Sequence, residues 1–141
     1  MCAEIRRGNG ENMKMIKLSD NLSLSSIIQG FWRLCSWEWT AEELADFMNA
    51  CIERGVTSFD TAEIYGGTLC EKQMGDGFAL DSSIRGKIQL ISKTGISRRE
   101  VGGKAFGYYD TTYERIICSC KESLQRLRTD YLDARVIIGL S

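Results

Sequence analysis

Short strand-like runs alternate with helix-like runs along most of the chain, and this alternation constrains the fold more than any other feature. Three runs of apolar and β-branched residues, at 26–30, 56–60 and 88–93, are separated by segments whose apolar residues recur at helical spacing. A fourth strand-like run, 131–138, follows the last helical segment. This order is typical of right-handed βαβ units that build a parallel sheet. We therefore predict an α/β fold with about four parallel strands and alternating helices.

The first two helical segments differ in the strength of their signals. Thr40 followed by Glu43 matches a capping box, and apolar residues recur at helical spacing from there to about residue 55. The pattern of 69–80 is also helical, although two internal glycines weaken it.

The third helical segment is the longest and runs from about 111 to 128. Glu122 and Arg126 lie four residues apart, where opposite charges can pair on one face of a helix. The apolar stripe that we expect to face the core consists of Ile116, Ile117, Cys120, Leu124 and Leu127.

Three segments lie outside the alternation. Residues 15–26 alternate polar and apolar side chains around Asp20 and Asn21, which predicts a β-hairpin before the first parallel strand. The glycine-rich segment 94–110 is expected to be a loop. Residues 1–12 are polar, with no periodic apolar face, and are expected to be a mobile extension, so that the folded domain comprises 13–141.

Composition bears on the class of function. The formal net charge of −1 gives no electrostatic reason to expect nucleic acid or an anionic membrane as a partner. No apolar run approaches the ~20 residues that span a bilayer, and the N-terminus lacks the apolar core of a signal peptide, so we expect a cytoplasmic protein. The chain contains no histidine, which excludes Ser-His and Cys-His nucleophile pairs.

Six scattered cysteines are expected to be reduced thiols that pack as small apolar side chains. Cys118 and Cys120 lie two apart on a predicted helix, where side chains point apart. We expect no metal site, because no histidine is present to join the thiols.

Three residues with complementary chemistry are predicted at the ends of neighbouring strands. Asp60 ends one strand, Tyr65 follows in the next loop, and Lys93 ends the following strand. The carboxyl ends of parallel strands gather at one edge of a sheet, so these side chains can meet. A carboxylate keeps the lysine ionised, and an ammonium beside a phenol stabilises the phenolate, which suits a general acid. Separate roles as a cap, a surface aromatic and a solvated lysine remain the alternative.

The segments around these residues resemble the aldo-keto reductases, in particular the NADP-dependent oxidoreductase type. The likeness rests on "GVTSFDTAEIYGG" followed by "ISKTGI", with "QGFWRL" before them and "SLQRLRTDYLD" after them, and it extends from about 16 to 133. It implies the N-terminal half of a (β/α)8 TIM barrel and NADPH-dependent reduction of small carbonyl compounds, aldehydes and ketones.

The resemblance also implies roles for individual residues. Tyr65 corresponds to the proton donor, Lys93 to the residue that stabilises its phenolate, and Asp60 to the support of that lysine. Gly30, Trp32 and Asp60 correspond to positions beside the cofactor. Glu63 and Gly66 belong to the same motif, and the resemblance gives them no chemistry.

The last strand departs from the family pattern. In the family, this strand ends in Ile-His-Arg-Pro, and the histidine orients the substrate, whereas Ile138 stands in its position here. Arg135 stands where an apolar residue is expected, and an inward direction would leave its charge unpaired. A one-base deletion in the histidine codon would produce the residues at 137–140. We therefore expect a C-terminally truncated reductase.

The expected half-barrel has consequences for activity. It would supply about four of eight strands, leave two strand edges open, and lack most of the family's NADPH contacts. We expect this chain to be inactive alone. Two alternatives are a half-barrel completed by a partner, with possible edge-strand self-association, and a non-catalytic binding or regulatory module.

Overall fold

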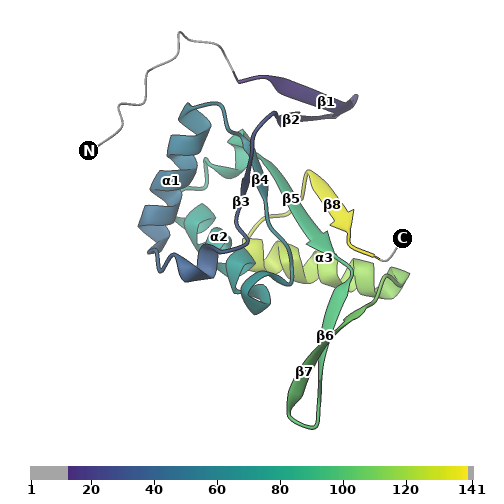
Figure 1. Cartoon of the computed structure of the whole chain (residues 1–141). Helices are drawn as coiled ribbons and strands as arrows, with labels where there is room; N and C mark the ends of the chain where they lie inside the picture. Colours follow the sequence, from purple (N-terminus) through teal and green to yellow (C-terminus); the bar gives the residue numbers. More distant parts are fainter. Residues whose placement is uncertain (1–12, 140–141) are drawn as a thin grey trace, which may run out of the picture.

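A four-stranded parallel sheet forms the centre of the computed structural model, which describes residues 13–139 (Figure 1). The strand order is β3-β4-β5-β8, and each strand is parallel to its neighbour. The predicted α/β fold with four parallel strands is therefore confirmed. The predicted extension at 1–12 lies outside the described residues. The strands are β3 (Ile28–Gly30), β4 (Ser58–Asp60), β5 (Gln89–Thr94) and β8 (Ala134–Ile137).

Three helices connect these strands, and α2 packs between the other two. The first helix begins at the predicted capping box: the hydroxyl of Thr40 accepts from the backbone N–H of Glu43, whose carboxylate accepts from the N–H of Thr40. None of the described helices is long and apolar enough to cross a membrane. The bounds are α1 (Ala41–Glu53), α2 (Leu69–Leu80) and α3 (Tyr113–Leu127), with short 3-10 turns η1 (Leu34–Ser36), η2 (Tyr65–Thr68) and η3 (Arg85–Lys87).

The hydrophobic core lies between the helices and one face of the sheet. Phe59 and Leu90 are register partners in β4 and β5 and have no exposed surface. Met48 from α1 and Met74 from α2 are equally buried and belong to the same cluster. Each such side chain contributes about 1.5–3 kcal/mol by leaving water. Because strand side chains alternate between faces, Asp60 and Ile91 point to the opposite face.

Two antiparallel hairpins flank the parallel sheet. The predicted N-terminal hairpin is confirmed as β1 (Met15–Ser19) and β2 (Leu22–Ser25), and the N–H of Ser25 donates to the hydroxyl of Ser58 at the start of β4. The second hairpin, β6 (Ile96–Val101) with β7 (Lys104–Tyr109), extends away from the sheet (Figure 1).

The second hairpin corrects the expectation of a loop at 94–110. Val101 pairs with Lys104, so Gly102 and Gly103 form a two-residue turn, with φ of +58° and +75°. A two-residue hairpin turn with positive φ at both positions favours glycine at both. The pair marks a turn between strands, and the sequence signal was present in Gly-Gly flanked by β-branched and aromatic residues.

The buried side of α3 also differs from the predicted apolar stripe. Ser119, Ser123 and Leu127 are its buried residues, whereas Ile117 is exposed. The two serines face Arg135 of β8, whose guanidinium donates to both hydroxyls. A stripe defined by apolar residues alone cannot detect polar positions that are buried by a partner on another element.

Arg135 corrects a second expectation, because its charge is not left unpaired. It is the register partner of Ser92 in β5, and its guanidinium points into the layer between sheet and helices. There it lies 3.9 Å from a carboxylate oxygen of Glu63 and 4.0 Å from one of Glu71. Burial lowers the pKa of Arg135, and the nearby carboxylate of Glu71 opposes this shift. A largely buried arginine is tolerated here because two buried acids lie beside it.

Candidate active site

The three candidate catalytic residues meet at the carboxyl ends of β4 and β5. Asp60 is the last residue of β4, and Lys93 is the penultimate residue of β5. Asp60 pairs in register with Ile91, so Lys93 lies two residues further along on the same face of the sheet. Tyr65 opens the η2 turn in the loop after β4. The parallel register therefore brings together residues that are up to 33 positions apart.

The ammonium of Lys93 is the centre of this cluster. Its Nζ lies 2.6 Å from Asp60 Oδ2, 3.0 Å from the carbonyl oxygen of Thr61 and 3.1 Å from the hydroxyl of Tyr65. An ammonium has three donors, so these acceptors account for its capacity. The side chains of Lys93 and Asp60 are 18% and 24% exposed, which strengthens their attraction relative to a fully solvated pair.

Backbone hydrogen bonds hold the loop that carries Tyr65. The N–H of Thr61 donates to the carbonyl of Ile91, and the N–H of Glu63 donates to the carbonyl of Lys93. The loop therefore continues along β5 past the end of β4. This continuation places the tyrosine directly over the lysine.

The side chain of Glu63 anchors the same loop to α3. It is buried and forms an ion pair with Arg115, while Ser119 and Thr94 donate hydroxyl hydrogen bonds to it over 2.8 and 3.1 Å. No role could be assigned to this acid from the sequence, because a loop glutamate looks the same in sequence whether it faces solvent or a buried partner. Its structural role is to hold the backbone two residues before Tyr65.

Gly30 and Trp32 lie beside the cluster. Gly30 is the register partner of Asp60 at the end of β3, and a Cβ added there would meet nothing within 4 Å. The surface next to Asp60 is therefore open. Trp32 is 65% exposed, and its ring lies 6.5 Å from the ring of Tyr65, centroid to centroid. These residues form one open, partly aromatic side of the cluster.

Ile138 also lies at the carboxyl ends of the parallel strands. Its N–H donates to the carbonyl of Thr94 over 2.7 Å, which continues the pairing of β8 with β5 beyond the last strand residue. Ile138, which stands where the family pattern has a histidine, is thus next to the end of β5, the strand that carries Lys93. An isoleucine side chain there offers neither a proton nor a hydrogen bond.

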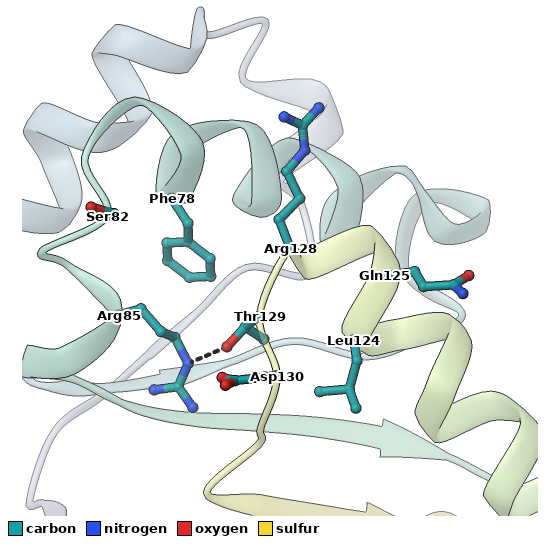
Figure 2. A pocket seen from close by; sticks show the side chains of 8 residues that line it. All are labelled: Phe78, Ser82, Arg85, Leu124, Gln125, Arg128, Thr129 and Asp130. Carbon is teal, nitrogen blue, oxygen red and sulfur yellow. Dashed lines mark hydrogen bonds between the residues drawn. The ribbon is translucent and has the colours of Figure 1, made fainter.

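A surface hollow of about 620 Å³ lies away from this cluster, beside residues that precede β5 and β8 (Figure 2). Arg85, at its wall, donates to Thr129, to the carbonyl of Tyr131 and to Asp133, and its guanidinium lies 3.7 Å from the centre of the Tyr131 ring. These bonds fix the segment that leads into β8. We assign this hollow to the stability of the fold, because the arginine at its wall is bonded to the chain itself.

Comparison with known proteins agrees with the fold described above. The sequence model described as "Aldo/keto reductase family" matches residues 26–137. The chain belongs to the aldo/keto reductase family. It is 39% identical over 127 residues to the uncharacterized oxidoreductase YcsN of Bacillus subtilis, and 36% identical over 113 residues to the oxidoreductase YdhF of Escherichia coli.

A solved aldo-keto reductase, AKR11C1 from Bacillus halodurans in its holo form, has the same fold, with a TM-score of 0.72 and 29% identity. The match covers 92% of this chain and 41% of that one. YcsN and YdhF are matched over 89% and 80% of this chain and over 42% and 38% of their own lengths. The 141 residues therefore span about two fifths of the length of these three proteins.

Proposed function

We propose that this chain carries the proton-donating part of a carbonyl-reducing active site, in which Tyr65 protonates the carbonyl oxygen of a small aldehyde or ketone. The observation that carries the proposal is the position of Lys93, whose ammonium bonds to both Asp60 and the hydroxyl of Tyr65. An ammonium beside a phenol stabilises the phenolate that remains after proton transfer. Membership of the aldo/keto reductase family and the oxidoreductase relatives support the same reaction class.

The residues around the cluster fit a nicotinamide cofactor, and we propose NADPH. Gly30 leaves the surface beside Asp60 open, and Trp32 presents an exposed aromatic ring next to Tyr65. Gly30, Trp32 and Asp60 are the residues that would hold the nicotinamide end. A bound NADPH supplies the hydride. Lys93 holds the phenol in place, and Tyr65 provides the proton at its hydroxyl.

We further propose that the 141 residues alone do not turn over substrate. Ile138 lies at the edge of the sheet where a histidine would orient the carbonyl, and its side chain has no polar atom. Loss of one positioned hydrogen-bond donor at such a site typically costs about 10²–10³ in kcat. The proton donor, Tyr65, therefore belongs to these 141 residues, whereas orientation of the substrate depends on a residue that they do not contain.

A chimera tests the proton-donor assignment. Residues 16–137 of this chain are joined to the part of the B. subtilis relative that begins at its counterpart of Ile138, and NADPH oxidation is measured with glyceraldehyde. We expect turnover by the chimera, and a loss of kcat of about 10²–10⁴ in the Tyr65→Phe variant, which removes only the hydroxyl.

The matched control is Tyr113→Phe. Tyr113 is 74% exposed at the start of α3, so its hydroxyl contributes nothing to the cluster, and activity should be unchanged. Equal activity of the Tyr65→Phe and Tyr113→Phe chimeras would remove Tyr65 from the reaction. Turnover by the unmodified 141-residue chain would overturn the proposal that it is inactive alone.

The open edges of the sheet support a second candidate function, association with another copy or with a partner that completes the barrel. β3 and β8 form the two edges, and Ile28, Val136 and Ile137 on them are 44%, 43% and 51% exposed. Unpaired strand edges with apolar side chains favour pairing with another chain. Light scattering across protein concentrations should show association that a Val136→Lys variant abolishes. A monomer at all concentrations would remove the self-association candidate.

A further inference from the structure

Two cysteine sulfurs lie in contact directly beneath the loop that carries Tyr65. Cys35 belongs to the η1 turn, and Cys70 is the second residue of α2. Their Sγ atoms are 3.2 Å apart, although the residues are 35 positions apart in the chain. Both thiols are free. A disulfide bond is about 2.05 Å long, so the two sulfurs need to approach each other by only about 1.2 Å.

We propose that Cys35 and Cys70 form a reversible intrachain disulfide when the protein meets a hydroperoxide. The pair does not depend on the proposed reductase activity, because neither sulfur belongs to the cluster of Asp60, Tyr65 and Lys93. It lies instead where η1 and α2 meet, beneath the loop that carries Tyr65. A disulfide there would link η1 covalently to α2.

The two thiols differ in a way that sets the order of the steps. Cys35 is half-buried and can be reached by a small oxidant, whereas Cys70 has no exposed surface. Burial, together with the hydrogen bond to Cys35, raises the pKa of Cys70 to about 11. Hydroperoxides oxidise the thiols that they can reach, and burial together with the raised pKa protects Cys70, so Cys35 is the residue that is oxidised first.

Hydrogen peroxide transfers one oxygen to the sulfur of Cys35, giving a sulfenic acid and one water. The sulfur of Cys70 then attacks the sulfur of Cys35, the S–O bond breaks, and the thiol proton leaves with the hydroxide as a second water. In total, two thiols lose two hydrogen atoms and become one disulfide, while one peroxide is reduced to two waters.

Gly66 connects this pair to the active-site loop. Its φ is +57°, and a Cβ added there would overlap the sulfur of Cys35 and lie 3.1 Å from that of Cys70. The backbone next to Tyr65 therefore rests on the two sulfurs. The sulfur of Cys70 also lies 3.8 Å from the carbonyl oxygen of Trp32. The disulfide would therefore restrain the backbone at both Tyr65 and Trp32.

Peptide mapping of the 141-residue chain tests the proposal. The chain is treated with hydrogen peroxide, alkylated, and digested without reductant. We expect one linked peptide pair that contains Cys35 and Cys70 and is lighter by two hydrogens than the sum of the separate peptides. Dithiothreitol should separate it, and the oxidised chain should unfold several degrees higher than the reduced chain.

Three single-cysteine variants test the same proposal, so that the conclusion does not depend on the folding of any one of them. In Cys70→Ala, dimedone should trap a sulfenic acid on Cys35, and in the unaltered chain it should not. Cys35→Ser should abolish the linked peptide and the rise in Tm, whereas the matched change Cys51→Ser, on α1, should leave both unchanged. The proposal is overturned if Cys35 proceeds to a sulfinic acid while Cys70 stays a free thiol. It is equally overturned if Cys35 is linked only to another chain.

Discussion

Lys93 donates a hydrogen bond to the hydroxyl of Tyr65 over 3.1 Å, although 28 positions of sequence separate the two residues. The bond exists because β4 and β5 run in parallel and end at the same edge, and because the loop after β4 continues along β5. The same ammonium bonds to Asp60 at the end of β4. One side chain therefore ties together the strand, the loop and the candidate proton donor.

The first prediction concerns the contribution of Lys93 to the stability of the fold. Lys93→Met should lower the free energy of unfolding by about 1–3 kcal/mol, because the partly buried carboxylate of Asp60 loses its counter-charge. The control is Lys87→Met, since Lys87 is exposed and its ammonium bonds to the hydroxyl of Ser83. That change should stay within about 0.5 kcal/mol. Urea unfolding followed by circular dichroism measures both, and equal costs would show that the lysine contributes no stability to the loop.

A second prediction concerns Glu71, which has no exposed surface. Its carboxylate accepts from Ser92 over 2.6 Å and from Arg126 over 2.8 Å, and Arg135 lies 4.0 Å away. Glu71→Gln removes the negative charge and leaves two guanidinium groups facing a neutral amide. Breaking one side of a buried ion pair costs about 3–5 kcal/mol, and we expect a value near the lower end, because Glu63 also faces Arg135.

The matched control lies on the same helix. Asp76 is 31% exposed and pairs with Lys72 over 3.0 Å and with Arg128 over 2.8 Å. Asp76→Asn makes the same chemical change at a partly exposed position, and ion pairs near the surface contribute about 0–1 kcal/mol. Chemical denaturation of both variants gives the comparison. If Asp76→Asn destabilises as much as Glu71→Gln, burial is not the source of the difference.

The sequence predicted the parallel strands and the strand-end cluster because both depend on local patterns. Asp60 and Lys93 each end a short apolar run, and parallel strands bring such ends together whatever the rest of the fold does. The hairpin at 96–109 was missed because its glycine pair was interpreted as a loop, although paired strands flank it. The contact of Cys35 with Cys70 joins a turn and a helix that are 35 positions apart in the chain, so no local pattern could indicate it.

The buried acids show a further limit of sequence reasoning. Glu63 and Glu71 lie in segments where a solvent-exposed acid would be equally acceptable. Their burial is made possible by Arg115, Arg126 and Arg135, which come from α3 and β8, far along the chain. A single sequence gives the charge of each residue but not the identity of its partner. The ion pairs of these two glutamates therefore became evident only from the tertiary structure.

A third prediction concerns acid stability at the end of α2. Hydrogen bonds from Ser83, over 2.7 Å from its hydroxyl, and from Asn49 lower the pKa of Asp81. A carboxyl whose folded-state pKa is depressed stabilises the fold above its unfolded-state pKa, near 3.9. That stabilisation is lost as the pH falls through the lower folded-state pKa. Asp81→Asn should therefore lower the Tm at pH 7 and have no effect at about pH 2.

The control for this change is Asp46→Asn, on the exposed side of α1, where the carboxylate forms no hydrogen bond with the described part of the chain. Its Tm should follow that of the unaltered protein at both pH values. Thermal unfolding in matched buffers measures all three proteins. A Tm difference for Asp81→Asn that persists unchanged at low pH would show that the carboxylate charge is not its source.

The last prediction uses two glycines of α2 that lie two residues apart but face different neighbours. A Cβ added at Gly75 would overlap the carbonyl oxygen of Arg126 in α3, which is backbone and cannot rotate away, whereas one at Gly77 would lie 3.6 Å from Leu44. Alanine is favoured over glycine in a helix by about 1 kcal/mol. Gly77→Ala should therefore stabilise the fold, and Gly75→Ala should destabilise it by about 2 kcal/mol or more, since the helices must separate. Urea unfolding compares the two, and a gain of stability in both would show that α2 and α3 are not in close contact at Gly75.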